Sequence, residues 1–152
     1  MRRTPIVAGN WKMNGTLEEG GRITREILRG AVDFPGAETV LCPPYTALAK
    51  IGEMLKGSRI DLGAQNLHWE PKGAYTGEIS AGMLQETGCR WCIVGHSERR
   101  HLLGETDEMV RKKAQAGWKE GYLRRALKRR MILRMRAVRA TLGALPLAVR
   151  RW

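Results

Sequence analysis

His96 stands at the junction between a short apolar run, "CIVG" at residues 92–95, and a segment that begins with Ser97 and Glu98. An apolar run of this length that ends in glycine is typical of a buried strand, and Ser97 could cap the turn that follows. The partial positive charge at a helix N-terminus disfavours an imidazolium, so we expect the ring to be neutral. A neutral imidazole N–H could then donate to an oxyanion that develops on a substrate.

A cation and an amide follow another apolar run. Asn10 and Lys12 come after "PIVAG" within the string "GNWKMNG", and Gly15 permits a tight turn nearby. A lysine at that position could bind an anionic substrate, and Glu98 is a possible partner for it. The alternative interpretation is that Lys12 is a solvated loop lysine and His96 an ordinary core or surface histidine.

Strands and helices alternate along the chain. Apolar runs predict strands at 5–9, 39–42, 60–64 and 92–95, and apolar spacing predicts helices at 17–29, 46–55, 79–87 and 106–120. This alternation is typical of the α/β class with a parallel sheet, and strands that are apolar on successive residues are expected to be covered on both faces. Since parallel strands end at one edge of their sheet, we expect Asn10, Lys12 and His96 to approach one another there.

The positive charge is concentrated at the C-terminal end. The chain has 152 residues and a net charge of +12, but residues 1–118 hold 16 Lys and Arg against 14 Asp and Glu, whereas residues 119–152 hold 11 against one. We therefore divide the chain into a body, 1–121, and a basic Arg-rich tail, 122–152, which we expect to be helical or disordered. No apolar run approaches the ~20 residues of a membrane span, and three cysteines without a framework spacing favour a cytoplasmic location.

Four strings resemble one enzyme family. "GNWKMNG", "GAQN" with "GAYTGEIS", and "IVGHSERR" resemble, in order and spacing, the first half of the triosephosphate isomerases, over roughly residues 4–120. The resemblance implies a partial TIM (β/α)8 barrel with about four βα units. It also implies a cofactor-free, metal-free homodimer of glycolysis and gluconeogenesis, which interconverts dihydroxyacetone phosphate and glyceraldehyde 3-phosphate through an enediolate.

The resemblance also implies roles for single residues. Asn10 and Lys12 would contact the phosphorylated triose, and Lys12 would supply the positive charge. His96 would be the neutral electrophile that polarises the carbonyl. Glu98 would support Lys12, and Ser97 would support the site.

The string "NLHWEPKGAYTGE" resembles the dimer loop of the family. Thr76 would reach from this loop toward the active site of the partner subunit. His68 and Trp69 belong to the same loop and are given no catalytic role. Cys89 and Cys92 form a C-x-x-C spacing, for which a redox role is the less favoured interpretation.

The resemblance ends near Gly121. The carboxylate general base, the mobile lid and the glycine-rich phosphate loops of the family should follow, and nothing in the tail resembles them. Deprotonation needs a base within reach of the substrate carbon, and neither Glu98 nor Glu105 is an obvious substitute. We therefore expect the chain to have weak isomerase activity or none.

Several interpretations of the tail and of the half-barrel stay open. The tail could be a basic amphipathic helix that makes the chain a binding protein for nucleic acid or an anionic membrane. It could instead be a helix that covers the sheet, or the product of a shifted reading frame. The body could also be a half-barrel subunit that a partner completes, which would be a separately encoded half or a second copy.

Overall fold

The sheet has four parallel strands in the order β1-β2-β3-β4. The structure, a computed structural model, describes residues 4–30 and 36–119. The predictions for the tail 122–152 therefore lie outside the described residues. The strands are β1 (Ile6–Asn10), β2 (Glu38–Cys42), β3 (Ile60–Ala64) and β4 (Trp91–Cys92). The α/β class with a parallel sheet is confirmed, and the curled sheet with its alternating helices matches part of a TIM barrel.

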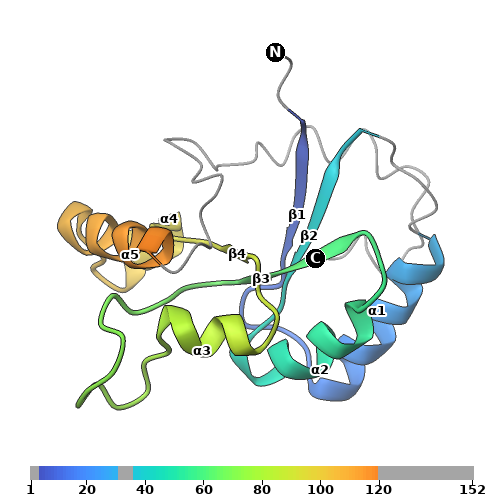
Figure 1. Cartoon of the computed structure of the whole chain (residues 1–152), viewed down its shortest axis with the longest axis horizontal. Helices are drawn as coiled ribbons and strands as arrows, with labels where there is room; N and C mark the ends of the chain where they lie inside the picture. Colours follow the sequence, from blue (N-terminus) through green and yellow to red (C-terminus); the bar gives the residue numbers. More distant parts are fainter. Residues whose placement is uncertain (1–3, 31–35, 120–152) are drawn as a thin grey trace.

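The register aligns the C-terminal ends of the strands. Asn10 of β1 lies beside Cys42 of β2, and Ala64 of β3 lies beside Cys92 of β4. The strand direction turns from β1 and β2 to β3 and β4, as Figure 1 shows, which is the coiling that a barrel wall requires. The loops that follow these strands consequently meet at one edge.

Five helices accompany the strands in the described ranges: α1 (Leu17–Gly30), α2 (Tyr45–Leu55), α3 (Ala81–Glu86), α4 (Ser97–Leu102) and α5 (Asp107–Lys119). Four of them begin with side-chain caps, among them Ser80 at α3 and His96 at α4. Thr16 and Glu19 form a reciprocal capping box at α1, and the Thr106 hydroxyl accepts from the backbone N–H of Met109 at α5. The predicted N-cap at Thr106 is therefore confirmed, whereas the predicted stop at Gly121 lies outside the described residues.

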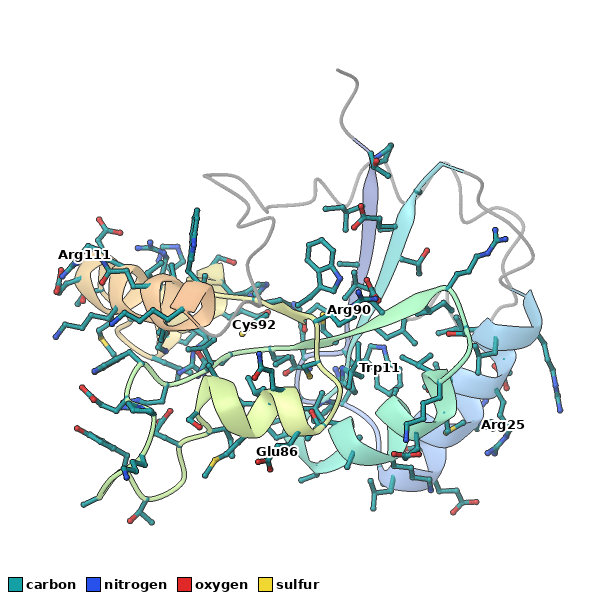
Figure 2. The ribbon with its side chains drawn as sticks, in the orientation of Figure 1. Trp11, Arg25, Glu86, Arg90, Cys92 and Arg111 are labelled. Atoms are coloured by element: carbon teal, nitrogen blue, oxygen red, sulfur yellow. The ribbon has the colours of Figure 1, made fainter. Side chains whose placement is uncertain are left out.

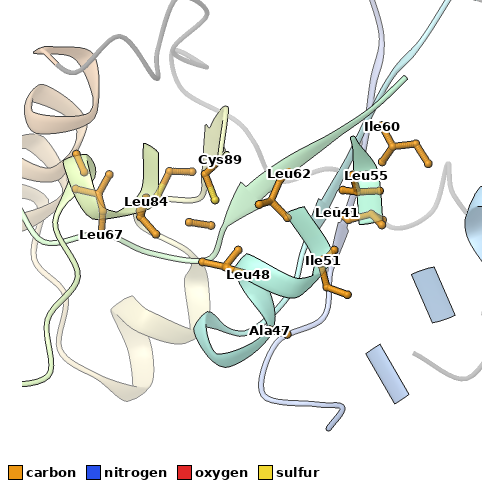
Figure 3. Close-up of a cluster of buried hydrophobic side chains, with 13 residues drawn as sticks. Leu41, Ala47, Leu48, Ile51, Leu55, Ile60, Leu62, Leu67, Leu84 and Cys89 are labelled. Carbon is orange, nitrogen blue, oxygen red and sulfur yellow. The ribbon is translucent and has the colours of Figure 1, made fainter. Parts of the chain in front are cut away.

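The core lies between α2 and the sheet. Leu48, Ile51 and Leu55 recur at helical spacing on α2 and are buried against Leu41 and Leu62 of the strands, as Figure 3 shows. The helices α1 and α2 pack side by side on the same face of the sheet. This layer of helices holds the strand ends in place.

Two predictions about the strands need correction. β1 is less buried than its apolar run suggests, and Val7 is 40% exposed, because β1 is the edge strand of the described sheet. β4 ends at Cys92 rather than at residue 95, although the Ile93 N–H still donates to the Ala64 carbonyl at 2.9 Å. No helix of the described residues is long and apolar enough to cross a membrane.

Candidate active site

The turn after β1 holds Lys12 in an unusual backbone conformation. Lys12 has φ 55°, in the left-handed region that residues other than glycine rarely adopt. The Asn10 side-chain oxygen accepts from the Lys12 N–H at 3.0 Å, which closes an Asx turn. Between them, Trp11 packs its indole against the core toward α1 and α2, as Figure 2 shows. The turn is therefore held from both sides, and strained positions of this kind concentrate at functional sites.

A side chain from β3's end bridges this turn to β2. The Gln65 amide nitrogen donates to the Lys12 carbonyl at 2.9 Å and to the Cys42 carbonyl at 2.8 Å. An amide group has two N–H donors, so one side chain satisfies both backbone acceptors. Gln65 thereby fixes the position of Lys12 relative to the neighbouring strands.

The structure brings Lys12 and Glu98 together across 86 positions of sequence. The Lys12 ammonium donates to a Glu98 carboxylate oxygen in an ion pair whose two side chains are about half exposed. This hydrogen bond is the largest effect on the pKa of Glu98 and lowers it. Desolvation opposes it less strongly, and the charge of Lys12 lowers the pKa further, so the pKa is lowered overall. Glu98 is thus ionised and committed to Lys12.

His96, rather than Ser97, caps α4. The Nδ1 atom of His96 accepts from the Glu98 N–H at 3.3 Å, and Ser97 is the first helical residue. The prediction that Ser97 caps this turn was wrong, because the turn at Gly95 already places the His96 ring over the first free N–H groups of the helix. A nitrogen that accepts a hydrogen bond carries no proton, so the ring proton is on Nε2. This tautomer presents Nε2–H as a donor.

Gly95 aligns His96, and both its backbone polar groups are held by side chains. The Gly95 N–H donates to Glu105 at 3.1 Å, and its carbonyl accepts from the Arg100 guanidinium at 3.2 Å. Gly95 has φ +66°, and a Cβ there would lie 3.0 Å from both γ-methyl groups of Val110. Only glycine fits this position, which explains why the apolar run ends in glycine before the histidine.

A buried polar network that sequence reasoning missed supports this corner. Besides Gly95, the Glu105 carboxylate accepts from the Arg99 guanidinium at 3.2 Å and from the Lys113 ammonium. Lys113 also donates to the Asn66 side-chain oxygen at 2.9 Å. Burial raises the pKa of Glu105, but hydrogen bonds and charge from Lys113 and Arg99 outweigh it, so the pKa is lowered overall. The available signal was Lys113 itself, which lies three residues after Val110 on the inward face of α5.

The carboxylates near His96 are all engaged. Glu98 is paired with Lys12, Glu105 is buried among three donors, and Asp107 accepts from Arg100 at 2.6 Å. A general base needs a free carboxylate aimed at the substrate carbon. The described part of the chain therefore places an imidazole and a cation at this corner, and the carboxylates next to His96 are not available as a base.

The other predicted site residues lie apart from this corner. Thr76 is exposed within the segment 71–78, every residue of which is exposed and which projects from the fold between β3 and α3 (Figure 1). Cys89 and Cys92 are free and buried, as is Cys42. Burial raises the pKa of Cys89 to about 11, which makes its thiol a poor nucleophile. In the described ranges no group of three or more His, Cys, Asp or Glu side chains could hold a metal ion.

Comparisons with known proteins agree on one family. The family profile described as "Triosephosphate isomerase" matches residues 5–124. The triosephosphate isomerase of Moorella thermoacetica is 51% identical over 121 residues, which are 80% of this chain and 48% of that protein. The triosephosphate isomerase of Aquifex aeolicus is 50% identical over 116 residues, which are 76% of this chain and 46% of that protein.

A solved structure shows the same correspondence. The crystal structure of triosephosphate isomerase from Bartonella henselae matches with a TM-score of 0.72 and 46% identity. The match covers 78% of this chain and 49% of that structure. The chain therefore spans about half the length of the relatives that it matches.

Proposed function

This chain belongs to the triosephosphate isomerase family, and from that membership we propose that its described residues form the substrate-binding and electrophilic half of a triose phosphate site. The observation that carries the proposal is the approach of Lys12 and Glu98 beside the His96 cap of α4. The substrates that follow from the family are dihydroxyacetone phosphate and glyceraldehyde 3-phosphate, which places the reaction in glycolysis and gluconeogenesis. A cytoplasmic location is proposed with it.

Each residue has a role that its contacts support. The Lys12 ammonium attracts the dianionic substrate, and Asn10 holds the turn that presents it. The Nε2–H of His96 donates to the substrate oxygen that becomes an oxyanion in the enediolate. Glu98 orients Lys12, and Ser97 stands at the start of α4, where its first turn faces the same corner.

We expect the proposed half-site to bind the triose phosphate but to isomerise little of it. Proton abstraction requires a base, and the carboxylates beside His96 are held by Lys12, Lys113, Arg99 and Arg100. We therefore expect weak isomerisation or none from the groups described, with substrate binding retained.

The exposed segment 71–78 is proposed as the contact to a second copy of the chain. Thr76 and its neighbour Tyr75, which is 44% exposed, lie in this segment, so both are free to reach another protein. The measurement is sedimentation of the full chain with and without the change Tyr75→Glu. A mass that stays unchanged at high concentration would contradict this dimer contact.

The main experiment measures binding and turnover separately on the purified 152-residue chain. Dihydroxyacetone phosphate should shift the amide NMR signals of residues 10–12 and 96–98, and a coupled assay should detect little or no glyceraldehyde 3-phosphate. The change Lys12→Met should abolish the shifts. The matched control is Lys56→Met, because Lys56 also pairs with a glutamate, Glu53, on an exposed surface remote in sequence from the site.

Two outcomes would contradict the proposal. If dihydroxyacetone phosphate shifts the amide signals of the Lys12→Met variant as much as those of the Lys56→Met variant, Lys12 does not bind the substrate. Fast turnover that His96→Gln abolishes would mean that a base is present.

A further inference from the structure

The Nδ1 atom of His96 has two groups of Glu98 within reach. It accepts from the Glu98 backbone N–H at 3.3 Å, and a Glu98 carboxylate oxygen lies 3.6 Å from the same atom. A small shift of the ring would let Nδ1 carry the proton and donate to that carboxylate, and the neutral ring would then have no proton on Nε2. The imidazole therefore presents Nε2–H only while the backbone holds the ring over the first turn of α4.

The backbone that leads to His96 is permissive. The chain enters through Gly95, whose φ is +66°, and glycine can adopt many other conformations at little cost. Glu105 holds the Gly95 N–H at 3.1 Å, but that N–H belongs to the peptide before the glycine. The peptide after the glycine, which carries His96, can turn about the ψ angle of Gly95 and needs a restraint of its own.

Arg100 supplies this restraint and holds the peptides on both sides of His96. Its side-chain Nε donates to the Gly95 carbonyl at 3.2 Å, and its backbone N–H donates to the His96 carbonyl at 3.1 Å. Each carbonyl oxygen lies in the plane of its peptide, so the two hydrogen bonds fix the orientation of the peptides before and after the histidine.

The Arg100 guanidinium is held in turn by α5. Its Nη1 donates at 2.6 Å to Asp107, the first residue of α5 (Figure 1). The two side chains are 37% and 93% exposed, so the ion pair adds little to the stability of the fold through its charge. The guanidinium is planar and rigid, however, and a fixed Nη1 aims Nε at the Gly95 carbonyl.

We propose that Arg100 is a positioning residue, which keeps His96 in the tautomer that presents Nε2–H. The hold on the ring is a property of the chain without substrate. The use of Nε2–H toward a substrate oxygen rests on the function proposed above.

The change Arg100→Lys separates the contact to Gly95 from the charge. Lysine has a methylene where arginine has Nε, so the bond to the Gly95 carbonyl is lost while the ammonium keeps a cation near Asp107. Because over a third of the Arg100 side chain is exposed, we expect the variant to fold. The matched control is Arg111→Lys, since the Arg111 Nε donates at 2.8 Å to Glu108 on the exposed surface of α5.

NMR of isotope-labelled histidine side chains in the full chain reads the tautomer, with the His96 signals assigned from their loss in His96→Gln. The unchanged chain and Arg111→Lys should show one tautomer, with the proton on Nε2. Arg100→Lys should show a mixture of both tautomers. Its Glu98 amide should also exchange with solvent about two- to tenfold faster, the population change that one hydrogen bond makes.

Asp107→Asn is the converse variant. It removes the charge of Asp107 but keeps a side-chain oxygen that accepts from Arg100, so the guanidinium should keep its contact with Gly95. The single His96 tautomer should therefore persist. If the charge of the ion pair were what mattered, the pattern would reverse: Arg100→Lys would keep the tautomer and Asp107→Asn would lose it.

That reversed pattern would overturn the positioning role, and so would a single tautomer with unchanged Glu98 exchange in Arg100→Lys. An Arg100→Lys chain that does not fold would also contradict it, because Arg100 would then be a structural residue. Titration with dihydroxyacetone phosphate separates this role from the proposed function. If the tautomers mix in Arg100→Lys but the unchanged chain binds no substrate, the proposed function alone fails. If the unchanged chain binds substrate and the tautomer does not depend on Arg100, the positioning role alone fails.

Discussion

Lys113 and Glu105 form an ion pair that is buried on both sides, with 2% and 1% of the two side chains exposed. The pair connects α5 to Gly95, the residue directly before His96, through a second oxygen of the same carboxylate. The two buried charges are tolerated because each has a further hydrogen-bond partner. The Arg99 guanidinium donates to the Glu105 carboxylate, and the Lys113 ammonium donates to the Asn66 side-chain oxygen.

Glu105→Gln should destabilise the fold strongly. The change leaves the Lys113 ammonium buried without its carboxylate, and breaking such a pair costs roughly 3–5 kcal/mol. Thermal unfolding should show the loss. Glu108→Gln removes an exposed partner of Arg111 instead and should cost about 1 kcal/mol or less. A double variant, Glu105→Gln with Lys113→Met, should recover part of the stability, and a double variant less stable than Glu105→Gln would contradict this account.

Acid should weaken the fold through Glu105. Its pKa is lowered in the folded chain, so its contribution to stability is complete above the pKa of the unfolded chain and is lost as the pH falls through the folded value. The free energy of unfolding, measured with urea between pH 7 and pH 3, should fall as Glu105 becomes protonated. In the Glu105→Gln variant this free energy should fall less over the same pH range, because the contribution of Glu105 is missing. An unchanged pH profile in the variant would contradict the prediction.

Lys12→Met should raise the pKa of Glu98 toward its ordinary value. The hydrogen bond from Lys12 is the main cause that lowers this pKa. Titration of the Glu98 side-chain carboxyl by NMR measures the change directly. Because both side chains are about half exposed, the effect on the stability of the fold should be small, in contrast to that of Glu105.

Gly52→Ala should destabilise α2 although alanine favours helices. A Cβ at Gly52 would lie 2.5 Å from the Thr87 backbone carbonyl oxygen, and this clash outweighs the ~1 kcal/mol that alanine gains in an open helix. We expect a loss of about 1–3 kcal/mol in the free energy of unfolding. Gly30→Ala at the end of α1 meets nothing within 4 Å and should be neutral or slightly stabilising.

The three thiols should react only after unfolding. Burial raises the pKa of Cys42 to about 12, with a smaller contribution from Cys89, and the Cys92 thiol is shifted upward for the same reason. A disulfide reagent at pH 8 should therefore leave Cys42, Cys89 and Cys92 unlabelled in the native chain and label all three in denaturant. Rapid labelling of the native chain would mean that the C-x-x-C pair is accessible.

Local patterns predicted the elements well and their ends less well. The apolar run at residues 60–64 matches β3, and the spacing of Leu48, Ile51 and Leu55 matches the buried face of α2. The helix start expected after His96 matches α4, but its length was not predicted, because a six-residue helix with no buried residue leaves no apolar pattern. The strand predicted to end at residue 95 ends at Cys92, since the turn at Gly95 is imposed by Glu105, Arg100 and Val110 from outside the strand.

The sequence alone determined that Asn10, Lys12, His96 and Glu98 belong to strand ends, because strand and helix periodicity are local properties of a chain. Only the tertiary structure decided how these residues meet. Gln65 holds the left-handed turn at Lys12, and Glu105 with Lys113 holds the turn before His96. Those contacts join residues far apart along the chain, and their energy arises from burial and pairing that exist only once the sheet and its helices have packed.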